Sequence, residues 1–288
     1  MELQLCRKKR KLERIFRSMG SVVVAFSGGV DSTLLLHEAQ RMVAGRVLAV
    51  TAASPSLPER ELAAARVMAA DMAVEHLVIR TDELHDPRYA RNFNDRCYYC
   101  KAMLFNKLLS IAEAREMEWV AYGANISDML EVRPGAQAAR ELGIRSPLVE
   151  AGLTKEEVRE LSRLAGLPTW AKPAAACLAS RFPYGFSLSR EVFRQVEQAE
   201  DLLLGLGFRQ LRVRHHGELA RLEVAPEEMP QMLQTQVCRE VVAGLQKLGY
   251  RYITLDLQGY RTGSFNQAPE GGNIAAVRIH AAAEQVKA

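Results

Sequence analysis

Short apolar runs alternate with longer amphipathic stretches over the first half of the chain, and this alternation constrains the fold more than any other feature. The apolar runs, which we predict to be strands, cover residues 21–26, 46–52, 74–80 and 119–125. Helices are predicted from near Asp31, over residues 57–72 and over residues 101–117. Strands that are separated by helices form a parallel sheet with helices on both faces. We therefore predict an α/β fold whose ligands bind beyond the carboxyl ends of the strands.

The pattern changes after about Leu153. Residues 153–168 predict a helix with Thr154 as its N-cap, and residues 169–185 predict a long functional loop rich in proline, alanine and glycine. One helix, two strands, further helices and a last strand then follow, which indicates a small α+β unit with an antiparallel sheet. We predict two domains, residues 1–185 and residues 186–288, and assign substrate binding and oligomerisation to the second.

Composition and charge restrict the location and the partners. No apolar run approaches the roughly 20 residues that span a bilayer, and no apolar signal-peptide core follows the basic segment CRKKRKLERIFR. We therefore expect a cytoplasmic protein without a membrane partner. The net charge of +4 is spread along the chain, so nucleic acid is not an expected partner. Separately, a homo-oligomer is expected.

The string FSGGVDS, residues 26–32, lies between the first predicted strand and the following helix. Gly28 and Gly29 permit backbone conformations and close approaches that side chains would block, so successive N–H groups can surround an anion. Ser27 and Ser32 add hydroxyl donors, and the helix N-terminus adds the positive end of its dipole. The string has neither the Walker sequence nor G-x-G-x-x-G spacing. A plain glycine-rich turn is the alternative, but the complete string at this position favours a phosphate site.

Residues 27–32 resemble the SGGxDS pyrophosphate loop (PP-loop) of enzymes that transfer AMP from ATP to a carbonyl or carboxyl oxygen. GMP synthetase, NAD synthetase, argininosuccinate synthetase and tRNA-thiolating enzymes belong to this group. The resemblance implies ATP and Mg²⁺ as cofactors, an adenylate intermediate, and a catalytic role for Asp31. Further nucleotide contacts are predicted where the carboxyl ends of the strands converge, at Thr51, Ala52, Gly123 and Asn125.

A second resemblance involves the string CLASRFPYG, residues 177–185, together with RVRHHGELARLEV and GYRYITLDLQGYRTG. These strings resemble the LarE family of ATP-dependent sulfur transferases, and the match covers nearly the whole chain. The family converts carboxylates of pyridinium-3,5-biscarboxylic acid mononucleotide to thiocarboxylates during synthesis of the nickel-pincer nucleotide cofactor. The resemblance implies that Cys177 is the nucleophile, with Arg181 either lowering the pKa of its thiol or holding the adenylate. A structural ion pair of Arg181 is the alternative.

The substrate site is predicted from the same resemblance. Arg212 and Arg214 lie on one face of a predicted strand and Glu223 lies on the next strand, which implies a site for the substrate phosphate. A solvated sheet face is the simpler interpretation of the same pattern. Ser180 and Arg181 complete the predicted set.

Five cysteines are present, and two of them, Cys97 and Cys100, form a Cys-x-x-Cys pair. Cys6 and Cys238 are expected to be inert. Many LarE-like chains have only the equivalent of Cys177 and consume its sulfur, leaving dehydroalanine. Three thiolates do not complete a Cys₄ zinc site, and no histidine is spaced to supply a fourth ligand.

The resemblance to three-cysteine tRNA-thiolating enzymes implies instead a [4Fe–4S] cluster on Cys97, Cys100 and Cys177, with one iron open to sulfide from a donor protein or from solution. A Cys97–Cys100 redox pair, two structural cysteines and the sacrificial Cys177 route are the alternatives. A tRNA-thiolating or amide-forming relative and a catalytically silent ATP-binding protein are competing functions.

Overall fold

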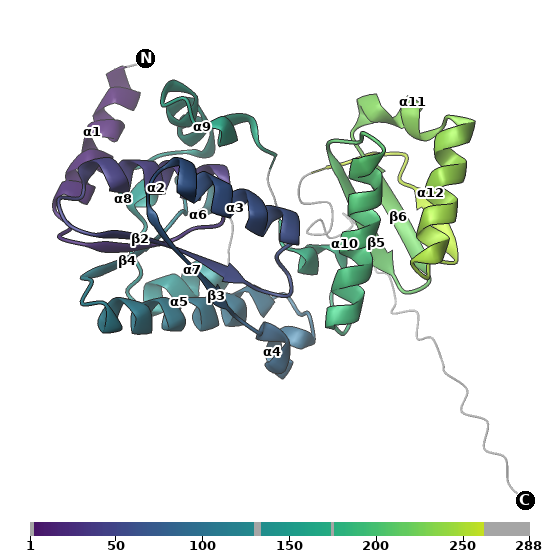
Figure 1. Ribbon diagram of the computed structural model, residues 1–288, viewed down its shortest axis with the longest axis horizontal. Coiled ribbons are helices and arrows are strands. Elements are labelled where there is room, and N and C mark those ends of the chain that lie inside the picture. The colour runs from purple at the N-terminus through teal and green to yellow at the C-terminus, as the bar shows by residue number, and fades with distance from the viewer. Residues whose placement is uncertain (1–2, 130–133, 174–175, 262–288) are drawn as a thin grey trace, which may run out of the picture.

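A four-stranded parallel sheet lies at the centre of the larger, N-terminal part of the molecule. The computed structural model describes residues 3–129, 134–173 and 176–261, so residues 262–288 of the predicted second domain lie outside it. The strand order is β3-β2-β1-β4 (Figure 1). The strands are β1 (Val22–Ala25), β2 (Val47–Ala53), β3 (Glu75–Arg80) and β4 (Trp119–Tyr122). The predicted α/β fold is thereby confirmed.

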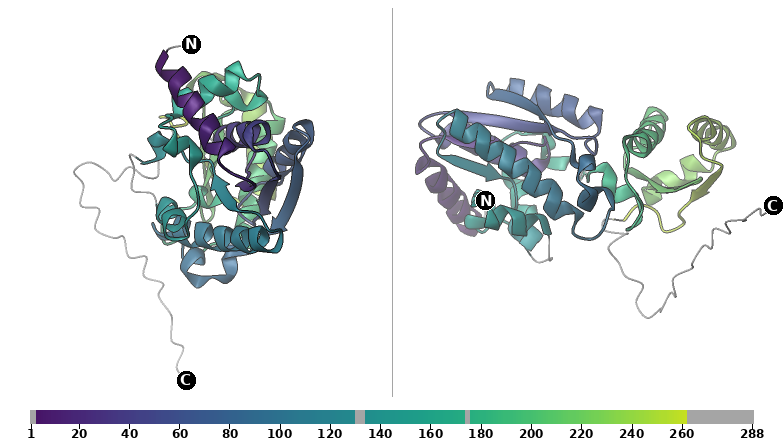
Figure 2. Two further views of the ribbon diagram at one scale, coloured as in Figure 1. Left: turned by 90° about the vertical axis from the view of Figure 1, so that its left-hand side faces the viewer. Right: turned by 90° about the horizontal axis from the view of Figure 1, so that it is seen from below.

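Helices cover both faces of this sheet, as predicted (Figures 1 and 2). Val22 and Val24 of β1 belong to one core cluster, whereas Val23 between them belongs to another, as expected of a strand buried on both faces. The first cluster includes residues of α1 (Leu3–Arg17), α2 (Val30–Met42), α3 (Glu59–Asp71) and α9 (Lys155–Leu164). The second includes residues of α5 (Arg96–Ala114) and α7 (Pro134–Glu141).

Helix α5 begins five residues earlier than predicted. It was expected from Lys101 but starts at Arg96, so Cys97 and Cys100 lie one turn apart near its N-terminus. The tyrosines between them have only moderate helix propensity. Tertiary packing explains the extension, since Cys100 packs on a buried cluster that contains Tyr89, Leu178 and Phe182.

Short helices connect the main elements. They are η1 (Glu83–His85), α4 (Pro87–Ala90), α6 (Ile126–Met129), α8 (Pro147–Glu150), η2 (Pro168–Ala171), η3 (Leu178–Arg181), η4 (Pro226–Glu228) and α11 (Met229–Met232). The sequence analysis did not predict those before residue 226, whereas the last two fall where it expected further helices. The predicted loop 169–185 contains all of η3 and all of η2 except its first residue, Pro168.

A second, three-stranded sheet lies in the C-terminal part, and its predicted antiparallel arrangement is only half correct. Strand β5 (Leu211–His216) pairs antiparallel with β6 (Leu219–Val224), but β6 pairs parallel with β7 (Tyr252–Leu255). The reason is the connection: α12 (Thr235–Lys247) lies between β6 and β7, and a helical crossover joins parallel strands.

Helix α10 (Arg190–Gly205) of the C-terminal part meets the N-terminus of α3 (Figure 1). Arg60 of α3 donates to Glu200 at 2.9 Å and to Asp201 at 2.6 Å. The Glu59 backbone N–H donates to the Glu197 carboxylate at 2.6 Å. These charged contacts link the two sheets, while the predicted domain boundary between residues 185 and 186 stays a prediction.

Within the described ranges, no helix combines the length and apolar character that crossing a membrane requires.

The buried His215 on β5 predicts a pH dependence of stability. Its Nδ1 lies 3.0 Å from the Tyr250 hydroxyl, and burial, with the charge of His216, lowers its pKa to about 4 from 6.5. Between these pH values the unfolded chain holds the proton that the folded protein excludes, so the free energy of unfolding should fall as pH decreases. Urea denaturation across this range should show a weaker fall for His215→Phe. The exposed His85→Asn is the control, and an unchanged pH slope in His215→Phe would contradict the prediction.

Candidate active site

The predicted phosphate cradle connects β1 to α2 at the carboxyl end of the sheet. Gly28 has φ +67°, which favours glycine, and an added Cβ would lie 3.2 Å from Ala65 of α3. Ser32 Oγ accepts from the Ser27 backbone N–H at 3.2 Å, lies 3.2 Å from Ser27 Oγ, and donates to Gly29 O at 3.2 Å. Gly29 supplies no side chain to cap α2. The loop is thus braced by its own hydroxyls at an uncapped helix N-terminus, the arrangement that an anion needs.

Asp31 lies in the first turn of α2 and has two partners from other elements. Asn125 Nδ2 donates to Asp31 Oδ1 at 3.0 Å, and Lys155 Nζ donates to Asp31 Oδ2 at 2.5 Å. The structure therefore brings the predicted pair Asp31 and Asn125 together. A carboxylate at this place is an oxygen ligand of the type that Mg²⁺ prefers.

Gly123 explains how β4 can approach the cradle so closely. A Cβ on Gly123 would lie 2.8 Å from the Ser32 backbone nitrogen and 3.0 Å from the Asp31 carbonyl carbon. Only glycine fits against this turn of α2 without displacing it. Gly123 therefore positions the cradle, which is a role that the sequence analysis did not foresee.

Thr51 supports the cradle from β2. Its side chain is buried, its hydroxyl donates to Phe26 O at 2.6 Å, and its Oγ1 lies 2.8 Å from His76 Nε2. The hydroxyl thus braces the residue that precedes the loop. Nucleotide contacts of Thr51 and of the half-buried Ala52 stay predictions.

Two lysines near the cradle were missed by the sequence analysis. Besides Lys155, Lys172 reaches the loop: its Nζ donates to Gly28 O at 3.1 Å and to Glu61 Oε2 at 2.7 Å. One signal was available for Lys155, the first residue of α9. A cation there is opposed by the helix dipole, so its presence indicates a nearby anion. The Lys172 contact joins segments 144 residues apart and leaves no local pattern.

The predicted nucleophile Cys177 is exposed. Its loop is held in place by hydrogen bonds to the main chain of the loop. The N–H of Leu178 donates to Ser56 O at 2.9 Å, which fixes the loop to the segment between β2 and α3. Ser180 Oγ donates to Cys177 O at 2.9 Å, and Arg181 Nη1 donates to Ala176 O at 2.7 Å and to Cys177 O at 3.1 Å. The thiol is thus presented on a braced turn.

Arg181 is almost fully buried, with 2% of its side chain exposed, and forms a two-pronged ion pair with Glu200 of α10. Its Nε and Nη2 donate to the two carboxylate oxygens at 2.9 Å and 3.0 Å. Burial alone would raise the pKa of Glu200, but the charge and hydrogen bonds of Arg181 hold it below its usual range. In this structure Arg181 acts as a clamp on the Cys177 loop, and its predicted catalytic and substrate contacts stay predictions.

Arg212, Arg214 and Glu223 lie together on the sheet of the C-terminal part, as predicted. Arg214 donates to Glu223 Oε2 at 2.7 Å and to Ser180 O at 2.7 Å. Arg212 stacks on Tyr260, with its guanidinium carbon 5.1 Å from the ring centre. Burial, followed by the charge of Arg181, lowers the pKa of Arg212. Several arginines thus converge beside the Cys177 loop, and two of them, Arg181 and Arg214, are paired with the carboxylates of Glu200 and Glu223.

The three predicted metal ligands Cys97, Cys100 and Cys177 share one neighbourhood. Cys100 Sγ lies 3.9 Å from Glu83 Oε1, and its cluster includes Leu178, the neighbour of Cys177. Burial raises the pKa of Cys100, followed by the charge of Glu83 and then those of Cys177 and Cys97. Cys97 and Cys177 thus both lie within electrostatic range of the Cys100 thiol.

The geometry of these thiols and their chemistry give different answers on whether they could hold a metal. Among the described residues, no three His, Cys, Asp or Glu side chains are arranged to hold a metal ion. A cluster, in contrast, distributes its ligands over several irons and takes soft thiolates, so Cys97, Cys100 and Cys177 suit it chemically. The cluster itself stays a prediction.

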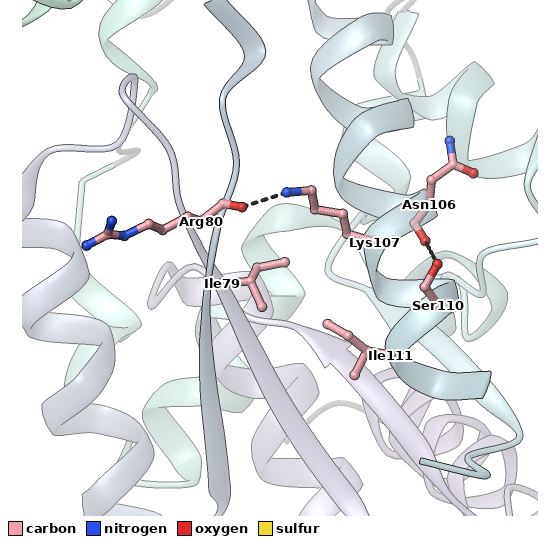
Figure 3. A pocket seen from close by; sticks show the side chains of 6 residues that line it. All are labelled: Ile79, Arg80, Asn106, Lys107, Ser110 and Ile111. Carbon is pink, nitrogen blue, oxygen red and sulfur yellow. Dashed lines mark hydrogen bonds between the residues drawn. The ribbon is translucent and has the colours of Figure 1, made fainter. Parts of the chain in front are cut away.

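A surface hollow of about 370 Å³ lies apart from these residues, between the edge strand β3 and α5 (Figure 3). Lys107 Nζ donates to Arg80 O at 2.7 Å across it. Its lining contains neither a cradle residue nor a cysteine; it consists of Ile79, Arg80, Asn106, Lys107, Ser110 and Ile111.

Comparison with known proteins identifies the family. Residues 10–118, which include the cradle, match the asparagine synthase family. The pyridinium-3,5-bisthiocarboxylic acid mononucleotide synthase of Lactiplantibacillus plantarum is 38% identical over 91% of this chain and 95% of its own length. This chain belongs to the family of that synthase. The predicted membership of the LarE family is confirmed, and with it the assignment as an enzyme of the ATP-using PP-loop class.

Two further relatives match over a similar length. An uncharacterized protein of Synechocystis sp. is 42% identical over 90% of this chain and 97% of its own length. An uncharacterized protein of Methanocaldococcus jannaschii is 26% identical over 90% of this chain and 98% of its own length.

The close approach of Gly123 to α2 leads to a stability prediction. Gly123→Ala should lower the free energy of unfolding by about 1–3 kcal/mol, because the new Cβ overlaps backbone that cannot move alone. Gly205→Ala is the matched control: Gly205 ends α10 with open space around its Cβ position, so this variant should be neutral or more stable. Urea denaturation measures both. Equal stability of Gly123→Ala and wild type would contradict the prediction.

Proposed function

We propose that this chain is a cytoplasmic ATP-dependent sulfur transferase that converts carboxylates of pyridinium-3,5-biscarboxylic acid mononucleotide to thiocarboxylates, forming AMP and pyrophosphate. The kinship with the synthase supports the substrate. The observation that carries the proposal is the position of the Cys177 loop. Before Cys177 in the sequence, Lys172 contacts the cradle residue Gly28. After Cys177, Ser180 contacts Arg214. One exposed thiol thus lies on a segment that joins a phosphate site to a cluster of arginines.

The first step activates a poor electrophile. A substrate carboxylate oxygen attacks the α-phosphorus of ATP, the bond to the β-phosphate oxygen breaks, and pyrophosphate leaves with the electron pair. The uncapped N-terminus of α2 and the hydroxyls of Ser27 and Ser32 are placed to hold that developing charge. Mg²⁺ would supply charge neutralisation, and Asp31 is the carboxylate best placed to hold it.

The second step introduces sulfur. In the sacrificial route, the Cys177 thiolate attacks the acyl carbon and AMP leaves, which forms a thioester. Loss of the Cα proton of Cys177 with cleavage of its Cβ–S bond then leaves thiocarboxylate on the substrate and dehydroalanine in the protein. In the route that we favour, a [4Fe–4S] cluster on Cys97, Cys100 and Cys177 would supply an open iron that carries a replaceable sulfide. The neighbourhood of the three thiols supports this choice.

The arginine cluster is proposed to bind the phosphate of the mononucleotide. Arg212 is half-buried. Burial and the charges of Arg181 and Arg214 lower its pKa, although Tyr260 and Glu200 act in the opposite direction. A dianion would offset this repulsion, and a guanidinium matches phosphate geometry in a two-pronged contact. The sulfur donor, which is a donor protein or free sulfide, and the homo-oligomer stay predictions.

Cys177→Ala should separate the two steps. With the dicarboxylate mononucleotide and ATP it should still release pyrophosphate, because the cradle is intact, but thiocarboxylate formation should fall by at least about 10³-fold. Mass spectrometry of the substrate and a pyrophosphate assay measure the two events. Cys238→Ala, whose thiol contacts Met232 O instead of the site, should behave as wild type. Thiocarboxylate formation at the wild-type rate by Cys177→Ala would exclude both routes.

Iron analysis distinguishes the routes. Anaerobically reconstituted protein should bind about four irons and four sulfides per chain, whereas Cys97→Ala and Cys100→Ala should lose most of both. Cys6→Ala is the control. A chain without iron, whose Cys177 loses one hydrogen sulfide in mass per product formed, would contradict the cluster and support the sacrificial route.

A further inference from the structure

Two lysines that come from outside the PP-loop reach its residues. Lys172 Nζ donates to Gly28 O at 3.1 Å and to Glu61 Oε2 at 2.7 Å. Lys155 Nζ donates to Asp31 Oδ2 at 2.5 Å. The two lysine side chains remain 23% and 28% exposed, so solvent and a solvent-borne ligand can reach them. Both side chains are therefore partly exposed beside the PP-loop, where the phosphates of a nucleotide would lie.

Helix α9 fixes the positions of both lysines. Lys155 is its first residue, and the helix start is held by a capping box between Thr154 and Glu157. One turn later, Arg159 donates to Trp170 O at 2.6 Å and to Lys172 O at 2.9 Å. The backbone of Lys172 is thus anchored while its side chain extends to the cradle. Such anchoring lowers the entropy that a lysine loses when it grips a ligand.

The charge balance of the cradle indicates why these lysines are needed. Backbone N–H groups and a helix N-terminus supply only partial charge, about half a unit for the dipole. A departing pyrophosphate carries several negative charges, and full cations are the usual partners that stabilise such a leaving group. Each lysine can rotate three N–H donors, and Lys172 has only two acceptors in the contacts above.

We propose that Lys172 and Lys155 bind the β- and γ-phosphates of ATP and the pyrophosphate that leaves. Glu61 and Asp31 hold the two ammonium groups beside the loop before the nucleotide arrives. On binding, Lys172 exchanges its contact with Gly28 O for a phosphate oxygen and Lys155 turns from Asp31 to the phosphates. The inference rests on the proposed function, because it takes ATP as the ligand.

The test compares ligands that differ in their phosphates. Full-length Lys172→Met and Lys155→Met are titrated calorimetrically with Mg-ATP, with Mg-pyrophosphate and with AMP. Loss of a charge-assisted contact should weaken ATP and pyrophosphate binding by about 10- to 100-fold in each variant. AMP affinity should be unchanged, because AMP lacks the phosphates that the lysines contact.

Lys107→Met is the matched control. Lys107 Nζ donates to Arg80 O at 2.7 Å at the surface hollow between β3 and α5, whose lining contains no cradle residue. The variant removes a hydrogen-bonded lysine of the same kind away from the PP-loop. All three affinities of Lys107→Met should equal those of wild type.

Glu61→Gln distinguishes ligand binding from a merely structural ion pair. If Lys172 binds phosphate, removing its carboxylate partner leaves ATP affinity equal or higher. If the pair only holds the fold, Glu61→Gln weakens ATP as much as Lys172→Met does, and the inference is overturned. Unchanged ATP and pyrophosphate affinities in both lysine variants, or an equal loss of ATP and AMP, would also overturn it. Wild-type protein that bound no ATP would instead reject the proposed function itself.

Discussion

The buried ion pair between Arg181 and Glu200 is the interaction on which the rest of the site depends. Both side chains are almost wholly removed from water, at 2% and 1% exposure. An uncompensated charge in such a place costs about 3–5 kcal/mol, so neither residue can be lost alone. The pair joins the Cys177 loop to α10, and Glu200 also receives Arg60 of α3 and the Val213 backbone N–H. The Glu200 carboxylate therefore links the Cys177 loop, helix α3 and strand β5.

Local patterns made much of the fold and of the cradle predictable. The strands of the first sheet follow from short apolar runs. Residues 27–32 lie within one strand-to-helix turn, so the local sequence is enough to predict this loop. The capping box of α9 was visible for the same reason. The parallel pairing of β7 was missed because strand direction depends on the path of α12 and not on the residues of the strand.

Contacts between distant segments could not be derived in this way. The sequence indicated that Arg181 matters but not that it would be buried against Glu200. It gave no sign that Lys172 would reach Gly28, or that Gly123 would press on Ser32. The neighbourhood of Cys97, Cys100 and Cys177 likewise depends on α5 starting at Arg96 and on packing around Leu178. The three cysteines were predicted from the family resemblance, and their positions in space became known only from the structure.

The clamp on the Cys177 loop has a consequence for the lifetime of the protein. Arg181 and Arg214 grip main-chain carbonyls of Ala176, Cys177 and Ser180, and none of these contacts involves the sulfur. These hydrogen bonds therefore do not require the sulfur atom of residue 177. If the sulfur were ever spent, the chain would keep its shape and its binding sites, and exhausted molecules would compete with fresh ones for nucleotide and substrate. A refillable sulfur carrier would remove that competition, which gives a selective reason for a chain of this kind to hold additional thiols beside the loop.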